Sequence, residues 1–236
     1  MEKTRINKYL AAIGIGSRRK IDDLIEQGEI FVNGERALPG IAVNEEDKII
    51  VSGKEISAKA EKKVYYMLNK PQKVVCAVSD EREKTVVQLI NDNRRIFPVG
   101  RLDMDTEGLL ILTNDGDLYN KIIHPRAEVY KTYFVRCRGN LNSEKIEALK
   151  NGVELDDGIT LPAIVKVFKS EEKFSELEIS IREGRNRQIR RMIDKVGSRV
   201  LYLRRNSIGK LKLDRELKIG EYRELTKEEL NYLYSL

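Results

Sequence analysis

The stretch Phe97–Gly116, FPVGRLDMDTEGLLILTNDG, decides how the rest of the chain is interpreted. Within it, Asp103 follows Arg101 in a short polar turn and precedes the apolar segment LLILT, which predicts a buried strand. A neighbouring cation keeps an acid ionised, and an adjoining strand holds it in place. Since the chain has a single histidine, His124, and no Ser–His pairing, Asp103 is the strongest candidate for a nucleophile or base.

The composition excludes several classes of protein. With 236 residues and 41% hydrophobic side chains, the chain can bury one larger and one smaller core. A mean hydropathy of −0.46, with no apolar run near 18 residues, predicts no transmembrane helix, and the start of the chain lacks the apolar region of a signal peptide. Cys76 and Cys137 lie far apart, which indicates reduced, buried thiols in a cytoplasmic protein. The chain has too few cysteines and histidines for a zinc site.

Positive charge is concentrated in one segment. The net charge is only +6, and residues 1–60 hold ten basic and ten acidic side chains. Residues 181–215, in contrast, hold twelve lysines and arginines against three acids. Such a concentration fits a polyphosphate partner, although a solvated basic face remains an alternative on this feature alone.

The first 57 residues predict a small unit of two short helices followed by two pairs of short strands. Thr4 and Ser17 are expected to cap the helices, and a glycine follows each helix. Asn33-Gly34 is the strongest short signal for a hairpin turn. The polar residues 58–63 lack periodicity and predict a linker.

Residues 64–236 predict a second, larger domain. Segments rich in β-branched and aromatic residues indicate strands: VYYMLNKP, VVCAV, LLILT, YKTYFVRCRG, ITLPAIVKVFK and SELEISIREG. Helices interrupt these strands without regular alternation, so we predict an α+β fold with a mixed, mostly antiparallel sheet and flanking helices. Lys70 and Pro71 close the first strand, where a backbone role is the default interpretation.

The helix predicted from Arg187 has one apolar stripe, which comprises Ile189, Met192, Ile193 and Val196. At about 100° per residue, Arg191 points nearly opposite this stripe and Arg187 also lies well away from it. Arg190 falls on the flank of the stripe, where it would be partly buried. Because a partly buried cation requires a partner, Arg190 is expected to pair with an acid.

The segment RINKYLAAIGIGSRRKIDDLIEQGEIFVNGERA resembles the RNA-binding domain named after ribosomal protein S4. The likeness covers the helix pair, the GSRR turn and the turn into EIFVNG. It implies contacts to structured RNA through shape and phosphates, with little recognition of bases. The positions that would meet RNA are Arg5, Lys8, Ser17, Arg18, Arg19 and Lys20.

Three further segments resemble, in order, the motifs of ribosomal RNA pseudouridine synthases, in the branch that carries an S4-type domain in front. They are GRLDMDTEG with LLILTNDG, KTYFV at 131–135, and EGRNRQIRRM at 183–192 with LYLRRNSIG at 201–209. The resemblance implies an isomerase that extrudes a uridine, detaches its base and rejoins it through carbon, with no cofactor and no metal. It implies Asp103 as the nucleophile, Tyr133 as the ring on the target base, and Arg190 as the cation paired with Asp103.

The same resemblance implies a wider RNA-binding surface and a substrate. Further contacts to RNA would come from Arg101, Arg185, Arg187, Arg191, Arg204 and Arg205. Arg187 and Arg191 in particular are expected to point outward to phosphates. The segments HPRAEVYKTY and EGRNRQIRRM favour the large-subunit enzymes, hence 23S rRNA, free or in an assembling subunit. We expect a monomer with no membrane contact.

Two alternatives stay open from the residues. The acids Asp103, Asp105, Glu107, Asp115 and Asp117 could form the metal site of a nuclease or phosphotransferase, which a chelator would inactivate. Against this, the twelfth position of the corresponding calcium loop is Asn114 rather than Glu, and LLIL occupies later ligand positions. A non-catalytic RNA-binding or ribosome-assembly factor would explain the first unit and the basic segment, but not Asp103 with Tyr133 and Arg190.

Overall fold

The computed structural model describes residues 3–56, 61–124 and 128–236, and the chain forms two compact units. The first unit comprises residues 1–64 with 92–95 and 114–116, and the second comprises the remainder. Part of the predicted linker, residues 58–60, lies outside the described residues. Within the described ranges, no helix combines the length and the apolar character needed to cross a membrane.

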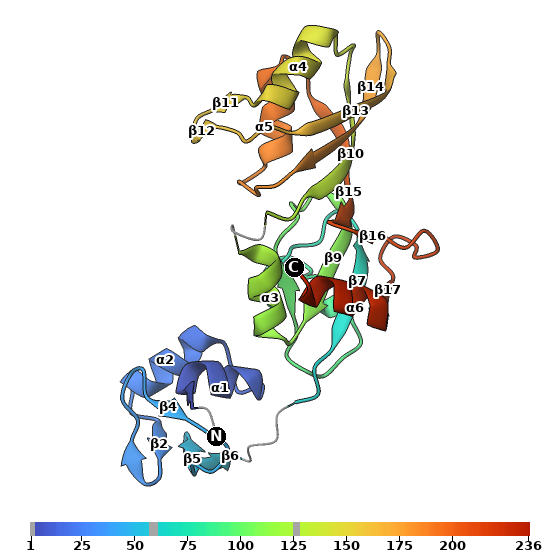
Figure 1. The fold of residues 1–236 in the computed structure, drawn as a ribbon. Coiled ribbons are helices and arrows are strands. Elements are labelled where there is room, and N and C mark those ends of the chain that lie inside the picture. Colours follow the sequence, from blue (N-terminus) through green and yellow to red (C-terminus); the bar gives the residue numbers. More distant parts are fainter. Residues whose placement is uncertain (1–2, 57–60, 125–127) are drawn as a thin grey trace. The chain divides into compact units, whose positions relative to one another are not determined.

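The first unit packs two helices against short strands (Figure 1). The strands form a four-stranded antiparallel sheet in the order β3-β2-β5-β6 and a separate pair, β1-β4. The elements are β1 Thr4–Arg5, α1 Ile6–Ala12, α2 Arg18–Glu26, β2 Ile30–Val32, β3 Glu35–Arg36, β4 Ala42–Val43, β5 Ile49–Val51 and β6 Lys54–Ile56.

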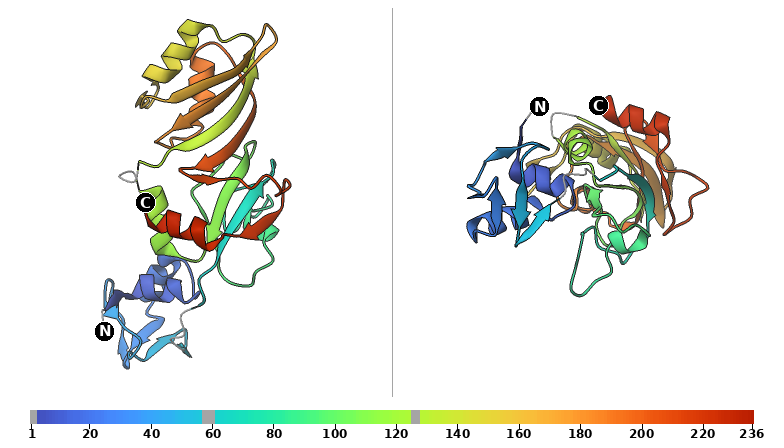
Figure 2. Two further views of the ribbon diagram at one scale, coloured as in Figure 1. Left: turned by 45° about the vertical axis from the view of Figure 1, so that its right-hand side comes forward. Right: turned by 90° about the horizontal axis from the view of Figure 1, so that it is seen from below.

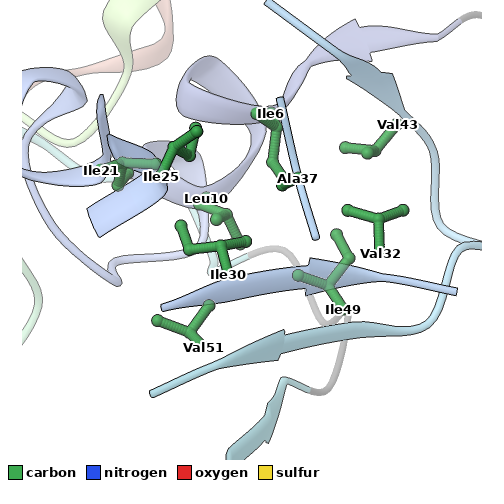
Figure 3. Packing of buried hydrophobic residues seen from close by; sticks show 10 residues of the cluster. All are labelled: Ile6, Leu10, Ile21, Ile25, Ile30, Val32, Ala37, Val43, Ile49 and Val51. Carbon is green, nitrogen blue, oxygen red and sulfur yellow. The ribbon is translucent and has the colours of Figure 1, made fainter. Parts of the chain in front are cut away.

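The core of the first unit is aliphatic, as Figure 3 shows. Each helix contributes two residues four positions apart, which therefore share one face. Alternate residues of β2 and β5 point toward the helices, because side chains of a strand alternate between its faces. The helix and strand residues are Ile6, Leu10, Ile21, Ile25, Ile30, Val32, Ile49 and Val51.

The turns and caps of this unit follow the sequence signals, with one exception. Ser17 Oγ accepts a hydrogen bond of 3.1 Å from the Lys20 amide, which confirms it as a cap. Asn33-Gly34 forms the predicted hairpin, with φ of 53° and 88°. The prediction that Thr4 caps α1 was wrong: Thr4 pairs with Val43 in β1-β4, and Arg5 occupies the cap position without a side-chain cap.

The second unit is built on one mixed sheet of nine strands in the described residues, which confirms the predicted α+β fold. The main order is β13-β14-β10-β15-β9-β7-β17, with β16 beside β15 and β8 beside β9. Only the β15-β9 pair is parallel among the described pairs of this sheet. The strands are β7 Tyr65–Lys70, β8 Phe97–Val99, β9 Glu107–Thr113, β10 Lys131–Arg138, β13 Ile164–Ser170, β14 Phe174–Ile181, β15 Val200–Ile208, β16 Leu211–Lys212 and β17 Tyr222–Glu224.

The remaining elements flank this sheet. Helices α4 and α5 lie on the same side of strands β13, β14, β10 and β15 in both Figure 1 and Figure 2. Helices α3 and α6 contribute Leu118, Ile122 and Leu233 to a core over β7 and β9. These elements are α3 Gly116–Ile123, α4 Ser143–Asn151, α5 Gln188–Lys195, α6 Lys227–Tyr234, the short 3-10 helix η1 Val87–Leu89 and the two-stranded pair β11 Glu154–Leu155 and β12 Gly158–Ile159.

One predicted strand does not form. The segment VVCAV has the composition of a strand but makes only an isolated bridge between Val75 and Thr85. Cys76 is buried, and its Sγ accepts a hydrogen bond of 3.3 Å from the Leu102 amide. The segment is therefore a loop beside the acidic turn, in which Val74 and Cys76 are buried while Val78 is exposed.

Candidate active site

Asp103 lies in the tight turn that enters β9. The Thr106 amide donates to the Asp103 carbonyl at 3.0 Å, and the Lys73 amide donates to the Met104 carbonyl at 2.8 Å. The Asp103 side chain is 27% exposed. The turn is thus fixed through its backbone, while the carboxylate remains accessible.

The buried side chain of Lys70 also holds this turn in place. It ends β7, it is fully buried, and its Nζ donates to the carbonyls of Pro71, Asp103 and Thr106 at 2.9, 3.2 and 3.0 Å. Burial lowers the pKa of Lys70, against the opposing influence of nearby acidic groups. The expectation of a backbone role for Lys70 was wrong, because its side chain fastens the turn that carries Asp103. The signal was present in the sequence: a lysine at the end of a strand that is mostly apolar needs acceptors where that end is buried.

Arg190 of α5 reaches the acidic turn. Its side chain is only 12% exposed, as the helix periodicity predicts. Its Nε lies 3.9 Å from Asp103 Oδ2, whereas its Nη2 makes shorter contacts of 3.2 Å to Asp105 Oδ1 and 2.9 Å to the Asp105 carbonyl. The structure therefore brings Arg190 to Asp103, but its hydrogen bonds fix the neighbouring Asp105.

Arg187 was expected to point outward, and the structure places it in the same cluster. Its two terminal nitrogens bind both oxygens of Asp105 at 3.2 Å, and its Nη1 lies 3.8 Å from Asp103 Oδ2. Arg187 is the N-cap of α5 and has a positive φ of 47°, so the angular spacing of a regular helix does not apply to it. Helical geometry predicted the wrong direction for this reason.

Asp105 takes the short contacts to the two arginines, and this leaves Asp103 with only longer ones. Burial works against ionisation of Asp105, yet the hydrogen bonds from Arg187 and the attraction of Arg190 outweigh it and lower its pKa. The two ion pairs of Asp103, at 3.8 and 3.9 Å, are longer than hydrogen bonds. A carboxylate that lies near two guanidiniums without short bonds to them keeps its lone pairs available for attack.

Tyr133 lies in the middle of the same sheet. The strand register forms one row through Lys70, Gly108, Arg205 and Tyr133 on β7, β9, β15 and β10. Tyr133 is 9% exposed, and no hydrogen bond or ring contact joins it to Asp103 among the described residues. The register aligns Tyr133 with the strand end at Lys70, which contacts the acidic turn.

The other predicted arginines differ in their surroundings. Arg101 is exposed, and the cations within 4 Å of Asp103 in the described chain come from α5 instead. Arg205 is only 2% exposed, and its Nε donates to the Leu109 carbonyl at 2.8 Å, so its prediction as a surface contact was wrong. Adjacent strand residues point to opposite faces, which is why Arg204 is half-buried while Arg205 is not accessible.

Two arginines near α5 hold the β11-β12 turn. Arg185 donates to the carbonyls of Gly158 and Ile159 at 2.8 and 2.7 Å, and Arg191 binds both oxygens of Asp157 at 2.9 and 3.0 Å. Arg191 does point away from Asp103, but an acid already binds it. Contacts of these two side chains to RNA remain predictions.

In the first unit, the predicted RNA contacts gather at the starts of the helices. Arg5, Arg18, Arg19 and Lys20 are exposed, while Lys8 is half-buried. Ser17 caps α2. Exposed cations at a helix start oppose the helix dipole, so an anion there would be favourable.

The acids of the alternative metal site have other partners. Tyr202 donates to Glu107 Oε2 at 2.6 Å, and burial together with this hydrogen bond raises the pKa of Tyr202 to about 12. Asp115 forms an ion pair of 2.9 Å with Lys63. In the described residues, no three His, Cys, Asp or Glu side chains are grouped to hold a metal ion.

Comparisons with known proteins agree with this geometry. The model of the RNA pseudouridylate synthase family matches residues 64–195, and the S4 domain model matches residues 4–49. Ribosomal large subunit pseudouridine synthase B of Bacillus subtilis is 40% identical over 237 residues, covering 98% of this chain and 96% of the relative. The dual-specificity RNA pseudouridine synthase RluF of Escherichia coli is 39% identical and covers 98% of this chain and 79% of the relative.

A solved structure extends the likeness to three dimensions. A crystal structure of a pseudouridylate synthase superimposes with a TM-score of 0.72 at 31% identity, covering 97% of this chain and 99% of the other. The match includes both the S4-type unit and the sheet that carries Asp103. The chain therefore belongs to the RNA pseudouridine synthases that carry an S4 domain, and it is an isomerase.

Proposed function

We propose that this protein converts a uridine of 23S ribosomal RNA to pseudouridine, with Asp103 as the nucleophile. The observation that carries the proposal is the Asp103 carboxylate, accessible on a turn fixed by Lys70 and flanked by two guanidiniums at 3.8 and 3.9 Å. The name of the B. subtilis relative favours the large-subunit RNA, and the dual-specificity relatives make a second RNA substrate the main competing possibility.

The chemistry needs a nucleophile and a pocket for an extruded base. Asp103 would attack either C1′ of the ribose, as the N1–C1′ bond breaks, or the uracil ring, before that bond breaks, and the base would then rotate. C5 of the base would bond to C1′, the bond to Asp103 would break, and C5 would lose a proton while N1 gains one. Arg190 and Arg187 would place positive charge beside the Asp103 carboxylate, and Tyr133 would pack on the base. Extrusion of a base from folded RNA costs a few kcal/mol, and stacking on an aromatic ring offsets about 1–3 kcal/mol of this.

A comparison of cells with and without this protein tests the substrate. We expect mapping of pseudouridines in both ribosomal RNAs to reveal one site in 23S rRNA that is lost without the protein and restored by the wild-type chain. Because ribosomal RNA is the substrate, we expect the protein to act in the cytoplasm. A lost site in 16S rRNA alone, or no lost site in 23S rRNA, would contradict the assignment to 23S rRNA.

The first unit is expected to supply phosphate contacts. Replacing Arg18, Arg19 and Lys20 together by Gln should weaken binding to a ribosomal RNA fragment and reduce the slope of log affinity against log salt by about 2–3, since each lost contact releases about one counterion fewer. The control is Lys48→Gln with Lys54→Gln, two cations of the same unit, of which Lys48 directly precedes β5 and Lys54 begins β6. Titrations at several salt concentrations measure the slope, and an equal change in both variants would contradict a specific role for α2.

A further inference from the structure

The sheet has an open face opposite α4 and α5. On β10, the residues Tyr133, Val135 and Cys137 are buried on the helix side, and the alternate residues Phe134 and Arg136 therefore point to the other side. Figures 1 and 2 show that the two helices cover only one side of these four strands. The outer strand β13 is exposed along most of its length.

Aromatic rings cross this open face. Phe134 stacks with Phe168 of β13, with 6.5 Å between ring centroids and 23° between planes. Tyr202 of β15 meets the Phe134 ring edge-on, with 6.1 Å between centroids. Phe168 is 50% exposed. The three rings, which we call the aromatic strip, thus end in Phe168, a ring that is partly open to solvent.

Cations accompany the aromatic rings. Lys166 Nζ lies 5.3 Å from the centroid of Phe168, while Arg136 and Lys169 lie 5.4 and 4.8 Å from the centroid of Phe174. Acids pair with two of these cations: Glu176 is bound by Arg136 at 2.6 Å and Glu171 by Lys169 at 2.9 Å. Two more acids, Glu178 and Asp214, line the adjoining cavity. Exposed cations next to aromatic rings provide both phosphate contacts and stacking surfaces, the two features with which proteins bind single-stranded nucleic acids.

A polar cavity adjoins the aromatic strip. It has a volume of about 670 Å³, and its lining includes Arg204, which is in register with Phe134, together with Lys212. Asn69 also lines it and is only 6% exposed. The Asn69 Nδ2 donates to the Leu217 carbonyl at 2.8 Å, but the Oδ1 has no hydrogen-bond partner. A buried acceptor without a partner favours a ligand that donates an N–H or O–H group.

We propose that the aromatic strip and this cavity bind a single-stranded RNA segment that flanks the target uridine. A base stacks on Phe168, Lys166 and Lys169 contact phosphates, and a nucleotide in the cavity donates to Asn69 Oδ1. The identity of this RNA as part of the substrate depends on the proposed function. Because Phe134 and Tyr133 point to opposite faces, this surface is separate from the side of the sheet on which the target base is expected.

Photo-crosslinking of the full-length protein to a single-stranded RNA decamer containing 5-iodouridine tests the site directly. We expect crosslinked peptides from β13 that include Phe168, and a lower yield with Lys166→Glu. Phe168→Ala should weaken binding of the decamer about tenfold, the loss expected for one stacked base, while Phe168→Trp should retain it. The first unit is also proposed to bind RNA, which would mask a change at the aromatic strip. The affinities are therefore measured in a variant in which Arg18, Arg19 and Lys20 are replaced by Gln.

The matched control is Val167→Ala, which alters the preceding residue of β13. Val167 is 41% exposed and pairs with the buried Leu177, so its side chain belongs to the opposite face. This variant should bind the decamer like the wild type. Equal affinities of Phe168→Ala and Val167→Ala for the decamer would overturn the proposal, and so would crosslinks confined to other elements. Either result is also the one expected if this face binds a protein instead of RNA. Pseudouridine formation by the wild-type enzyme, measured separately, reports on the proposed function alone.

Discussion

Replacing Asp103 by Asn is expected to abolish pseudouridine formation, with single-turnover rates lower by at least about 10³-fold. The amide has nearly the same shape as the carboxylate, and the turn is held by bonds to the Asp103 carbonyl rather than to its side chain. The variant should therefore fold normally but lack a nucleophile. Affinity for a ribosomal RNA fragment should stay within a few-fold, because phosphate contacts from elsewhere on the protein dominate binding.

Asp105→Asn is the matched control for this experiment. It removes the same charge from the same turn and weakens the side-chain contacts to Arg187 and Arg190, yet it leaves Asp103 and the Asp105 carbonyl in place. We expect a loss of about 10- to 100-fold, since the guanidiniums are held less firmly but the nucleophile remains. Rapid turnover by Asp103→Asn with an inactive Asp105→Asn would reverse the roles of the two acids. Asp103→Ala, which cannot deamidate to aspartate, checks any residual activity.

The spacing of apolar residues along α5 predicted the position of Arg190 correctly, but it failed for Arg187, which lies outside the regular helix. Ile189, Met192 and Ile193 lie inside α5 and are buried, so their spacing correctly placed Arg190 at the edge of the core. Arg187 precedes the helix with a positive φ, and no helical rule gives the direction of its side chain. Local patterns thus predict side-chain directions only within the element that generates them.

The partners of Lys70 and Arg205 could not be predicted from the sequence, for a different reason. Lys70 meets the Asp103 carbonyl across 33 positions of the chain, and Arg205 meets the Leu109 carbonyl across 96. Such pairings depend on which strands become neighbours, and composition indicates strands without giving their order. The overall α+β class was accessible because it depends on the succession of helices and strands and not on strand order.

The order of the strands also explains why Gly108 of β9 should not tolerate a side chain. The β9-β15 pair joins the strands β13, β14, β10 and β15 to β9, β7 and β17, and its register contains only Glu107 with Arg204 and Gly108 with Arg205. Gly108 has a φ of 104°, and a Cβ there would lie 2.3 Å from the Arg205 carbonyl oxygen and 2.8 Å from the Arg205 nitrogen. Neither backbone atom can move without separating the two strands.

Gly108→Ala is therefore expected to lower the free energy of unfolding of the second unit by about 3–5 kcal/mol, combining backbone strain with the displacement of β15. Turnover should fall as well, because Gly108 directly follows the turn that carries Asp103. Urea unfolding followed by tyrosine fluorescence measures this unit, since every tyrosine except Tyr9 lies in it.

Gly220→Ala separates the cost of backbone strain from the cost of displacing β15. Gly220 has a similarly positive φ of 88°, but a Cβ there would meet nothing within 4 Å. Its substitution should cost only the strain of a left-handed backbone, about 1–2 kcal/mol. The difference between the two variants, about 2–3 kcal/mol, then measures the close approach of β9 to β15. Equal unfolding midpoints of Gly108→Ala and Gly220→Ala would contradict this. They would mean that β9 and β15 can separate at little cost and that their pairing does not require a glycine at position 108.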